Sequence, residues 1–248
     1  MDTNALLYLV KDELKRRKSK SDRPKWRLYY LAAGIVLLLA VTAYFANKVK
    51  PMGLMFITFG LPYMSFMLAY SLVKKEWKNG TLGWWLSLPY SRSTLILSKY
   101  AASLCVVFLI FTAAWLITLF FYVYATIWQG SFEVAGLLSF MSDSSVWYLF
   151  VFAAIPFMNA FGLFTSIAGQ SRLKPLTPLL WMIYGLSGNA IFWLPPTPDK
   201  GQFLNTHLDN GSIPFGPYEF ALAVPISIGL AVILLLCSTV TLKKDVVL

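Results

Sequence analysis

The stretch from Tyr100 to Thr126 reads YAASLCVVFLIFTAAWLITLFFYVYAT and contains no Asp, Glu, Lys, Arg or His. A run of about 18 or more such residues marks a membrane-spanning helix, because the hydrocarbon core is about 30 Å thick and a helix rises about 1.5 Å per residue. The composition agrees, since 58% of the 248 residues are apolar and 13% are charged, whereas soluble domains have about 45–50% and about 25%. We therefore predict an all-α integral membrane protein.

Apolar runs of this kind recur along the chain and predict a six-helix transmembrane domain over residues 28–242. The predicted spans are Leu28 to Ala46, Met52 to Val73, Tyr100 to Thr126, Val146 to Ala168, Leu176 to Leu194, and Tyr218 to Leu242. Prolines fall inside three of these runs, at Pro62, Pro156 and Pro225. Since a proline in a helix frees a carbonyl that lipid cannot satisfy, we expect these helices to be kinked and packed in a bundle.

Basic residues are divided unevenly between the connecting segments. The segments before the first run, after the second, after the fourth and after the sixth hold 18 of the 21 Lys and Arg residues, and Lys48, Lys50 and Lys200 are the remaining three. The positive-inside rule then places both termini in the cytoplasm. The net charge of +10 does not indicate a nucleic-acid partner, because such a protein displays its basic residues on a soluble surface.

The terminal and outer segments complete the predicted organisation. In the cytoplasmic segment 1–27, the apolar residues Leu6, Leu7, Val10 and Leu14 recur at helical spacing, with basic residues mostly on another face. This pattern predicts an amphipathic helix on the inner membrane surface, and a solvated tail is the alternative. A Pro-rich outer loop covers 195–217, and a short cytoplasmic tail covers 243–248.

The segment between the second and third spans, residues 74–99, is the most informative connection and is called the elbow below. It reads KKEWKNGTLGWWLSLPYSRSTLILSK. Leu82, Trp85 and Leu86 share one helical face, which predicts a short interfacial helix between an Asn79-Gly80 turn and Pro89. Such an elbow is tied to two spans and can transmit a push, although a solvated loop with aromatic anchors would share these features.

The sequence lacks the residue patterns on which most enzymes and ion-coupled transporters depend. Among Asp, Glu, Lys, Arg and His residues, Glu219 is the only one inside the six predicted spans, and it lies at their outer edge. The single histidine, His207, has no second ligand at metal spacing, so we expect no metal site. The chain has no G-x-x-x-x-G-K-[ST] phosphate loop. Any directional work therefore needs energy from another polypeptide.

The elbow resembles the signature of the permease subunits of type-2 ABC exporters. The matching positions are Glu76, Asn79, Gly80, Thr81, Leu86, Leu88, Pro89, Ser91, Arg92 and Lys99. The six-span layout, the basic N-terminal segment and the outer segment before the last span also resemble this family. Trp84 and Trp85 depart from the smaller aliphatic residues that the family pattern leads us to expect.

The resemblance implies a permease that is not an enzyme by itself and lies in the plasma membrane of a bacterial cell. Its elbow would rest in a cleft of a separate ATPase subunit that holds ATP and Mg, while this chain binds no cofactor. The working unit would contain a second permease copy or a paralogue, in contact with membrane lipid and no nucleic acid. The residues implied for ATPase coupling are Glu76, Asn79, Gly80, Thr81, Leu82, Trp85, Leu86, Leu88, Pro89 and Arg92.

The expected function is export of a hydrophobic, lipid-like or peptide-like compound. Neutral polar and aromatic side chains within the predicted spans are candidates for the cargo path, and we select Asn159, Tyr63, Thr112 and Tyr122. Packing is the ordinary role of such residues, because helix pairing in membranes uses small and hydroxyl side chains. A membrane scaffold or sensor that docks a cytoplasmic regulator on the same elbow is the alternative function.

Overall fold

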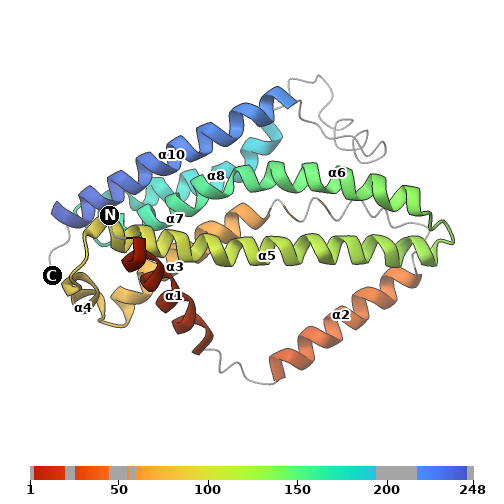
Figure 1. The fold of residues 1–248 in the computed structure, drawn as a ribbon, viewed down its shortest axis with the longest axis horizontal. Helices are drawn as coiled ribbons and strands as arrows, with labels where there is room; N and C mark the ends of the chain where they lie inside the picture. The colour runs from red at the N-terminus through yellow and green to blue at the C-terminus, as the bar shows by residue number, and fades with distance from the viewer. Residues whose placement is uncertain are drawn as a thin grey trace.

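The computed structural model describes residues 3–19, 26–44, 55, 58, 60–193 and 217–244 (Figure 1). These residues form helices joined by turns, and no strand occurs among them, which confirms the all-α class. The elements are α1 (Thr3–Ser19), α2 (Trp26–Tyr44), α3 (Gly60–Lys78), α4 (Leu82–Ser87), α5 (Arg92–Trp128), α6 (Val134–Ala153), α7 (Ile155–Ala168), the 3₁₀ turn η3 (Lys174–Leu176), α8 (Thr177–Trp193) and α10 (Pro217–Lys244).

Helix α5 is the spine of the bundle. Its 37 residues contain no glycine or proline and rise about 55 Å. The Ser91 hydroxyl caps the helix by accepting the Thr94 N–H at 3.2 Å. The turn that follows the helix contains Gly130 at a φ of +67°, which only glycine adopts without strain. Helices α1, α2, α3, α6, α7 and α10 all contact α5, so it links both ends of the molecule.

Two of the three prolines begin helices rather than kinking them. Pro62 lies in the first turn of α3, and Pro156 lies in the first turn of α7, directly after the break at Ala154. At Pro156 the predicted span is interrupted by the break between α6 and α7. A first-turn residue has no helical acceptor for its N–H, so proline loses no hydrogen bond at either position. Pro225 does lie inside its helix, α10.

Helices α3 and α7 form the most extensive helix–helix contact among the described residues. A Cβ atom built on Gly162 of α7 would lie 2.3 Å from the backbone oxygen of Phe66 in α3. The side chains around this contact, Phe66, Met158 and Phe161, are buried and pack on one another. Glycine is therefore required at position 162 for the two backbones to approach.

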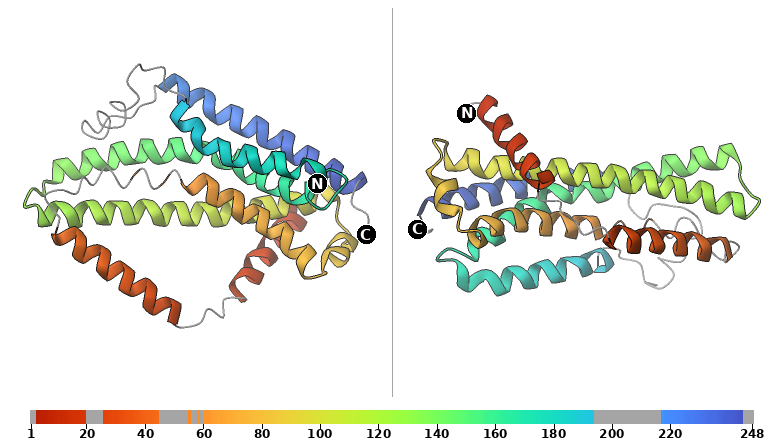
Figure 2. Two further views of the ribbon diagram at one scale, coloured as in Figure 1. Left: turned by 180° about the vertical axis from the view of Figure 1, so that it is seen from behind. Right: turned by 90° about the horizontal axis from the view of Figure 1, so that it is seen from below.

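The two ends of the bundle hold different parts of the chain, and exposed basic side chains gather at one of them. Helix α1, helix α4, the α7–α8 connection and the C-terminal end of α10 lie at one end, and the turn between α5 and α6 lies at the other (Figures 1 and 2). The first end carries the exposed basic side chains of Lys74, Lys75, Lys78, Arg172, Lys174, Lys243 and Lys244. The predicted cytoplasmic segments are thus neighbours in space.

Three helical segments of the described chain are long and apolar enough to cross a membrane: Arg92–Trp128, Val134–Ala168, which comprises α6 and α7, and Leu222–Lys244. They agree with an all-α membrane protein, while the number of six spans stays a prediction. Helix α6 begins 12 residues before the predicted start at Val146, because the helix continues through Asp143 toward the turn. The predicted outer loop 195–217 lies, except for Pro217, outside the described residues.

Candidate functional site

The elbow leaves α3 through a tight turn and enters a six-residue helix, α4. Gly80 lies in that turn with a φ of +68°, a conformation in which other residues are strained. The N–H of Thr81 donates to the Glu76 carbonyl at 3.0 Å and closes the end of α3. The chain thus reverses within a few residues and places α4 beside the start of α5.

One face of α4 is packed into the bundle and the other is exposed. Leu82, Trp85 and Leu86 are buried, whereas Gly83 and Trp84 are exposed. The buried face belongs to a core that joins α1, α3, α4, α5, α7 and α10: Leu9, Ala69, Val73, Leu82, Trp85, Leu86, Leu95, Ile96, Leu163, Ile167 and Leu242. The elbow is therefore a fixed projection of the bundle.

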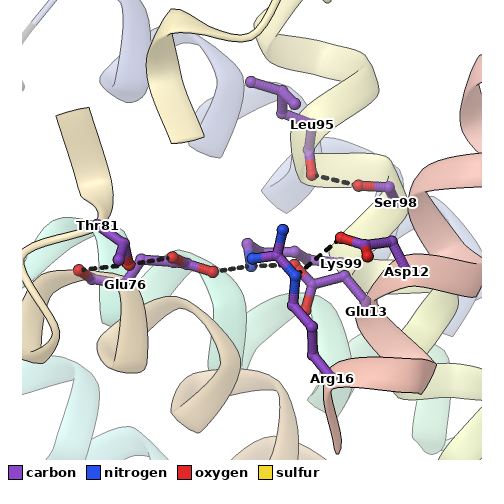
Figure 3. A network of polar contacts seen from close by, with 8 residues as sticks. All are labelled: Asp12, Glu13, Arg16, Glu76, Thr81, Leu95, Ser98 and Lys99. Carbon is purple, nitrogen blue, oxygen red and sulfur yellow. Dashed lines mark hydrogen bonds and ion pairs between the residues drawn. The ribbon is translucent and has the colours of Figure 1, made fainter. Parts of the chain in front are cut away.

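A cluster of buried charged side chains connects the elbow to the neighbouring helices (Figure 3). The Lys99 side chain is fully buried, and its Nζ donates to Glu13 Oε1 at 2.5 Å and to Glu76 Oε1 at 2.8 Å. Thr81 Oγ1 donates to the other carboxylate oxygen of Glu76 at 2.5 Å. The Lys99 Nζ also lies 4.9 Å from the centroid of a Trp85 ring, within cation–π range. One ammonium group therefore joins α1, α3, α4 and α5.

The electrostatics of the cluster keep Glu76 ionised. Burial would by itself raise the pKa of the Glu76 carboxyl, but the Lys99 charge and hydrogen bond, the Thr81 hydroxyl and the Arg16 charge together lower it below its ordinary 4.5. A lowered pKa means that Glu76 contributes stability above pH 4.5 and loses this contribution as the pH falls further. The cluster is therefore intact at neutral pH.

Two arginines add contacts at the edges of α4. The Arg16 guanidinium lies 5.1 Å from the centroid of a Trp84 ring and pairs with Asp12 at 2.8 Å. Arg92 Nη1 donates to the Leu86 carbonyl at 2.6 Å, which satisfies a carbonyl at the C-terminal end of α4. The two tryptophans that depart from the family pattern therefore each lie beside a cation, one from α1 and one from α5.

The structure divides the residues predicted for ATPase coupling into three groups. Glu76, Leu82, Trp85 and Leu86 are buried, Thr81, Leu88 and Arg92 are half-buried, and Asn79, Gly80 and Pro89 are exposed. The buried residues contact their own chain, whereas the exposed residues are open to a partner. Glu13 was missed by sequence reasoning, since only the packing of α1 reveals which acid faces Lys99.

The four residues predicted for the cargo path are not brought together. Asn159 is buried between α5 and α7, where its Oδ1 accepts from Ser103 Oγ at 2.6 Å. Tyr63 packs edge-on against Tyr184 with ring centroids 5.5 Å apart. Separately from these, Thr112 is exposed and its hydroxyl donates to the Phe108 carbonyl, and Tyr122 stacks on Phe140.

The arrangement defines a class of protein: a helical membrane protein whose charged end presents a rigidly held elbow. Within the described ranges, no group of three or more His, Cys, Asp or Glu side chains could hold a metal ion. Residues 5–184 match the family described as ABC-2 family transporter protein. The chain belongs to this family and is a transmembrane permease subunit of an ABC transporter, which confirms the resemblance. No curated protein and no solved structure matches it.

Proposed function

We propose that this permease exports a hydrophobic, lipid-like or peptide-like compound, driven by ATP hydrolysis in a separate subunit that docks on the elbow. The observation that carries the proposal is the anchoring of α4. Its inner face is buried in the core, where Trp85 lies beside Lys99, and Lys99 pairs with Glu76 of α3. The outer face of α4, at Gly83 and Trp84, is exposed. A docked partner that moved α4 would therefore move α3 and α5 with it.

The energy source lies outside this chain in the proposal. Membership in the ABC-2 family implies partnership with ABC ATPase subunits, and the sequence has no phosphate loop of its own. ATP and Mg would be bound by the ATPase, and this chain would contribute the pathway and the docking surface. A second permease copy or a paralogue would complete the unit.

The docking surface is tested by a charge placed on the exposed face of α4. A Cβ atom added at Gly83 would meet no atom within 4 Å, and glutamate has a higher helix propensity than glycine, so the bundle of the Gly83→Glu variant should fold normally. Co-purification with the ATPase should fall at least about tenfold, which corresponds to about 1.4 kcal/mol. Ser131→Glu, in the exposed turn at the opposite end, is the matched control and should leave co-purification unchanged.

The same experiment separates the transporter from the scaffold alternative. A scaffold that docks a cytoplasmic regulator would lose that regulator in the Gly83→Glu variant but would co-purify with no ATPase in either form. If the Gly83→Glu variant bound the ATPase normally and hydrolysis stayed coupled to export, the outer face of α4 would not be part of the docking surface.

The proposed topology places both termini and the elbow in the cytoplasm of a cell whose plasma membrane holds the protein. After Cys105 and Cys237 are replaced by serine, a single cysteine at Asn79 should resist an impermeant thiol reagent in intact cells. A cysteine at Ser131 should react, because both positions are exposed but lie at opposite ends of the bundle. Labelling at Asn79 from outside would reverse the proposed orientation.

The cargo path remains a proposal centred on Asn159. Its Nδ2 has no hydrogen-bond partner among the described residues although it is buried, and a buried amide donor of this kind is costly to leave unpaired. Export by an Asn159→Leu variant tests the role: unchanged export would exclude it, and failed assembly would assign Asn159 to packing with Ser103.

A further inference from the structure

Helix α1 has two faces with different surroundings. Ala5, Leu9 and Glu13 recur every four residues and point inward: the first two are buried, and Glu13 reaches Lys99. A second stripe, called the outer stripe below, consists of Leu7, Tyr8, Lys11 and Lys15, all of which are exposed. Leu7 and Tyr8 are 66% and 67% exposed. The sequence alone placed the apolar face differently, on Leu6, Leu7, Val10 and Leu14.

The described acids of α1 form ion pairs away from the outer stripe, so the stripe carries a net positive charge. Among the described residues of this helix, Asp12 pairs with Arg16 and Glu13 pairs with Lys99. No described carboxylate forms an ion pair with Lys11 or Lys15. The stripe thus combines exposed apolar side chains with uncompensated lysines one and two turns further along the helix.

This combination fits an anionic membrane surface. A helix at the interface inserts its apolar side chains below the headgroups while its lysines approach lipid phosphates. The outer stripe also lies at the end of the bundle where Lys74, Lys75, Lys243 and Lys244 are exposed. Charge complementarity therefore favours acidic lipid headgroups as the occupant over neutral lipid.

We infer that the outer stripe of α1 binds acidic phospholipid headgroups, and that this binding steadies the elbow through Glu13 on the opposite face of the same helix. Few contacts separate α1 from the elbow. Glu13 forms an ion pair with Lys99, and Lys99 forms an ion pair with Glu76 and lies over the Trp85 ring. A tightly docked α1 would keep Glu13 in place, and a released α1 would withdraw one carboxylate from Lys99. Lipid binding does not depend on the proposed function, although its consequence for ATPase coupling does.

The binding step is tested on the full chain in nanodiscs of phosphatidylcholine with and without phosphatidylglycerol. In a background without Cys105 and Cys237, Tyr8→Cys carries an environment-sensitive dye. Phosphatidylglycerol should shift its emission to the blue, and salt should weaken the shift by screening. Lys11→Glu with Lys15→Glu should abolish most of the shift. Lys243→Glu with Lys244→Glu makes the same charge change off α1 and should retain it.

The link to the elbow is tested by hydrogen exchange of residues 82–87 in the same nanodiscs. Phosphatidylglycerol should slow this exchange in the wild type and leave it unchanged in Glu13→Gln, which keeps the outer stripe intact. Equal dye emission in both lipids, or equal loss of the shift in both double variants, would overturn lipid recognition by the stripe. If Lys11→Glu with Lys15→Glu retained the lipid response but lost the ATPase, an acidic protein surface would be the occupant and the inference would be wrong. Neither readout requires ATP hydrolysis, so failure of the proposed function is detected separately.

Discussion

Replacing Lys99 by methionine is expected to destabilise the protein by about 3–5 kcal/mol, since removing one partner of a buried ion pair leaves an uncompensated charge. In this protein two carboxylates, those of Glu13 and Glu76, would be left facing each other's charge at a buried site. The contact between the Lys99 ammonium and the Trp85 ring would be lost as well. The midpoint of thermal unfolding in detergent, and protease cleavage between α3 and α5, would report the loss.

A control and a rescue make this prediction specific. Lys75→Met removes an exposed lysine from the same elbow and should change stability by no more than about 0.5 kcal/mol. Adding Glu13→Gln and Glu76→Gln to Lys99→Met removes the uncompensated charges and should recover much of the loss. An unfolding midpoint for Lys99→Met equal to that of Lys75→Met would show that the buried cluster does not support the elbow.

The sequence singled out three residues of this cluster but not the contacts between them. Glu76, Thr81 and Lys99 match the family signature, which implied ATPase coupling for Glu76 and Thr81 and gave Lys99 no role. Glu13 lies 86 positions from Lys99, and α1 offers two acids, Asp12 and Glu13, that point in different directions. Which acid meets Lys99 depends on how α1 rotates as Leu9 enters the core, and that rotation is a property of tertiary packing.

The fold shows the same division between local and non-local information. Apolar run length predicted the all-α membrane class, because the bilayer requires internal hydrogen bonding along each segment. Helix α6 starts before the predicted span at Val146, because a helix passes a single half-buried carboxylate, here Asp143, without interruption. The first-turn position of Pro156 depends on the break at Ala154, which periodicity does not encode.

Adding one carbon atom at the contact between α3 and α7 should also lower the stability of the protein strongly. The Cβ atom added by Gly162→Ala would meet the Phe66 oxygen at 2.3 Å and its carbonyl carbon at 3.0 Å. Both belong to the backbone of a helix and cannot rotate away, so α3 must shift as a unit. Overpacking of this kind typically costs about 1–3 kcal/mol, and the larger side chain of Gly162→Leu should prevent assembly of the two helices.

Gly162→Ala should shift the stability of the protein in the direction opposite to a glycine-to-alanine change at an uncrowded helical position. In an exposed helix, replacing glycine by alanine stabilises by up to about 1 kcal/mol, because alanine has the higher helix propensity. A Cβ atom added at Gly185 in α8 would meet no atom within 4 Å, so Gly185→Ala should raise the midpoint of thermal unfolding in detergent while Gly162→Ala lowers it. Equal shifts in the same direction would mean that Phe66 and Gly162 are not in backbone contact. Since α3 leads directly into the elbow, Gly162→Ala should also displace Glu76 and speed hydrogen exchange in α4, whereas Gly185→Ala should leave that exchange unchanged.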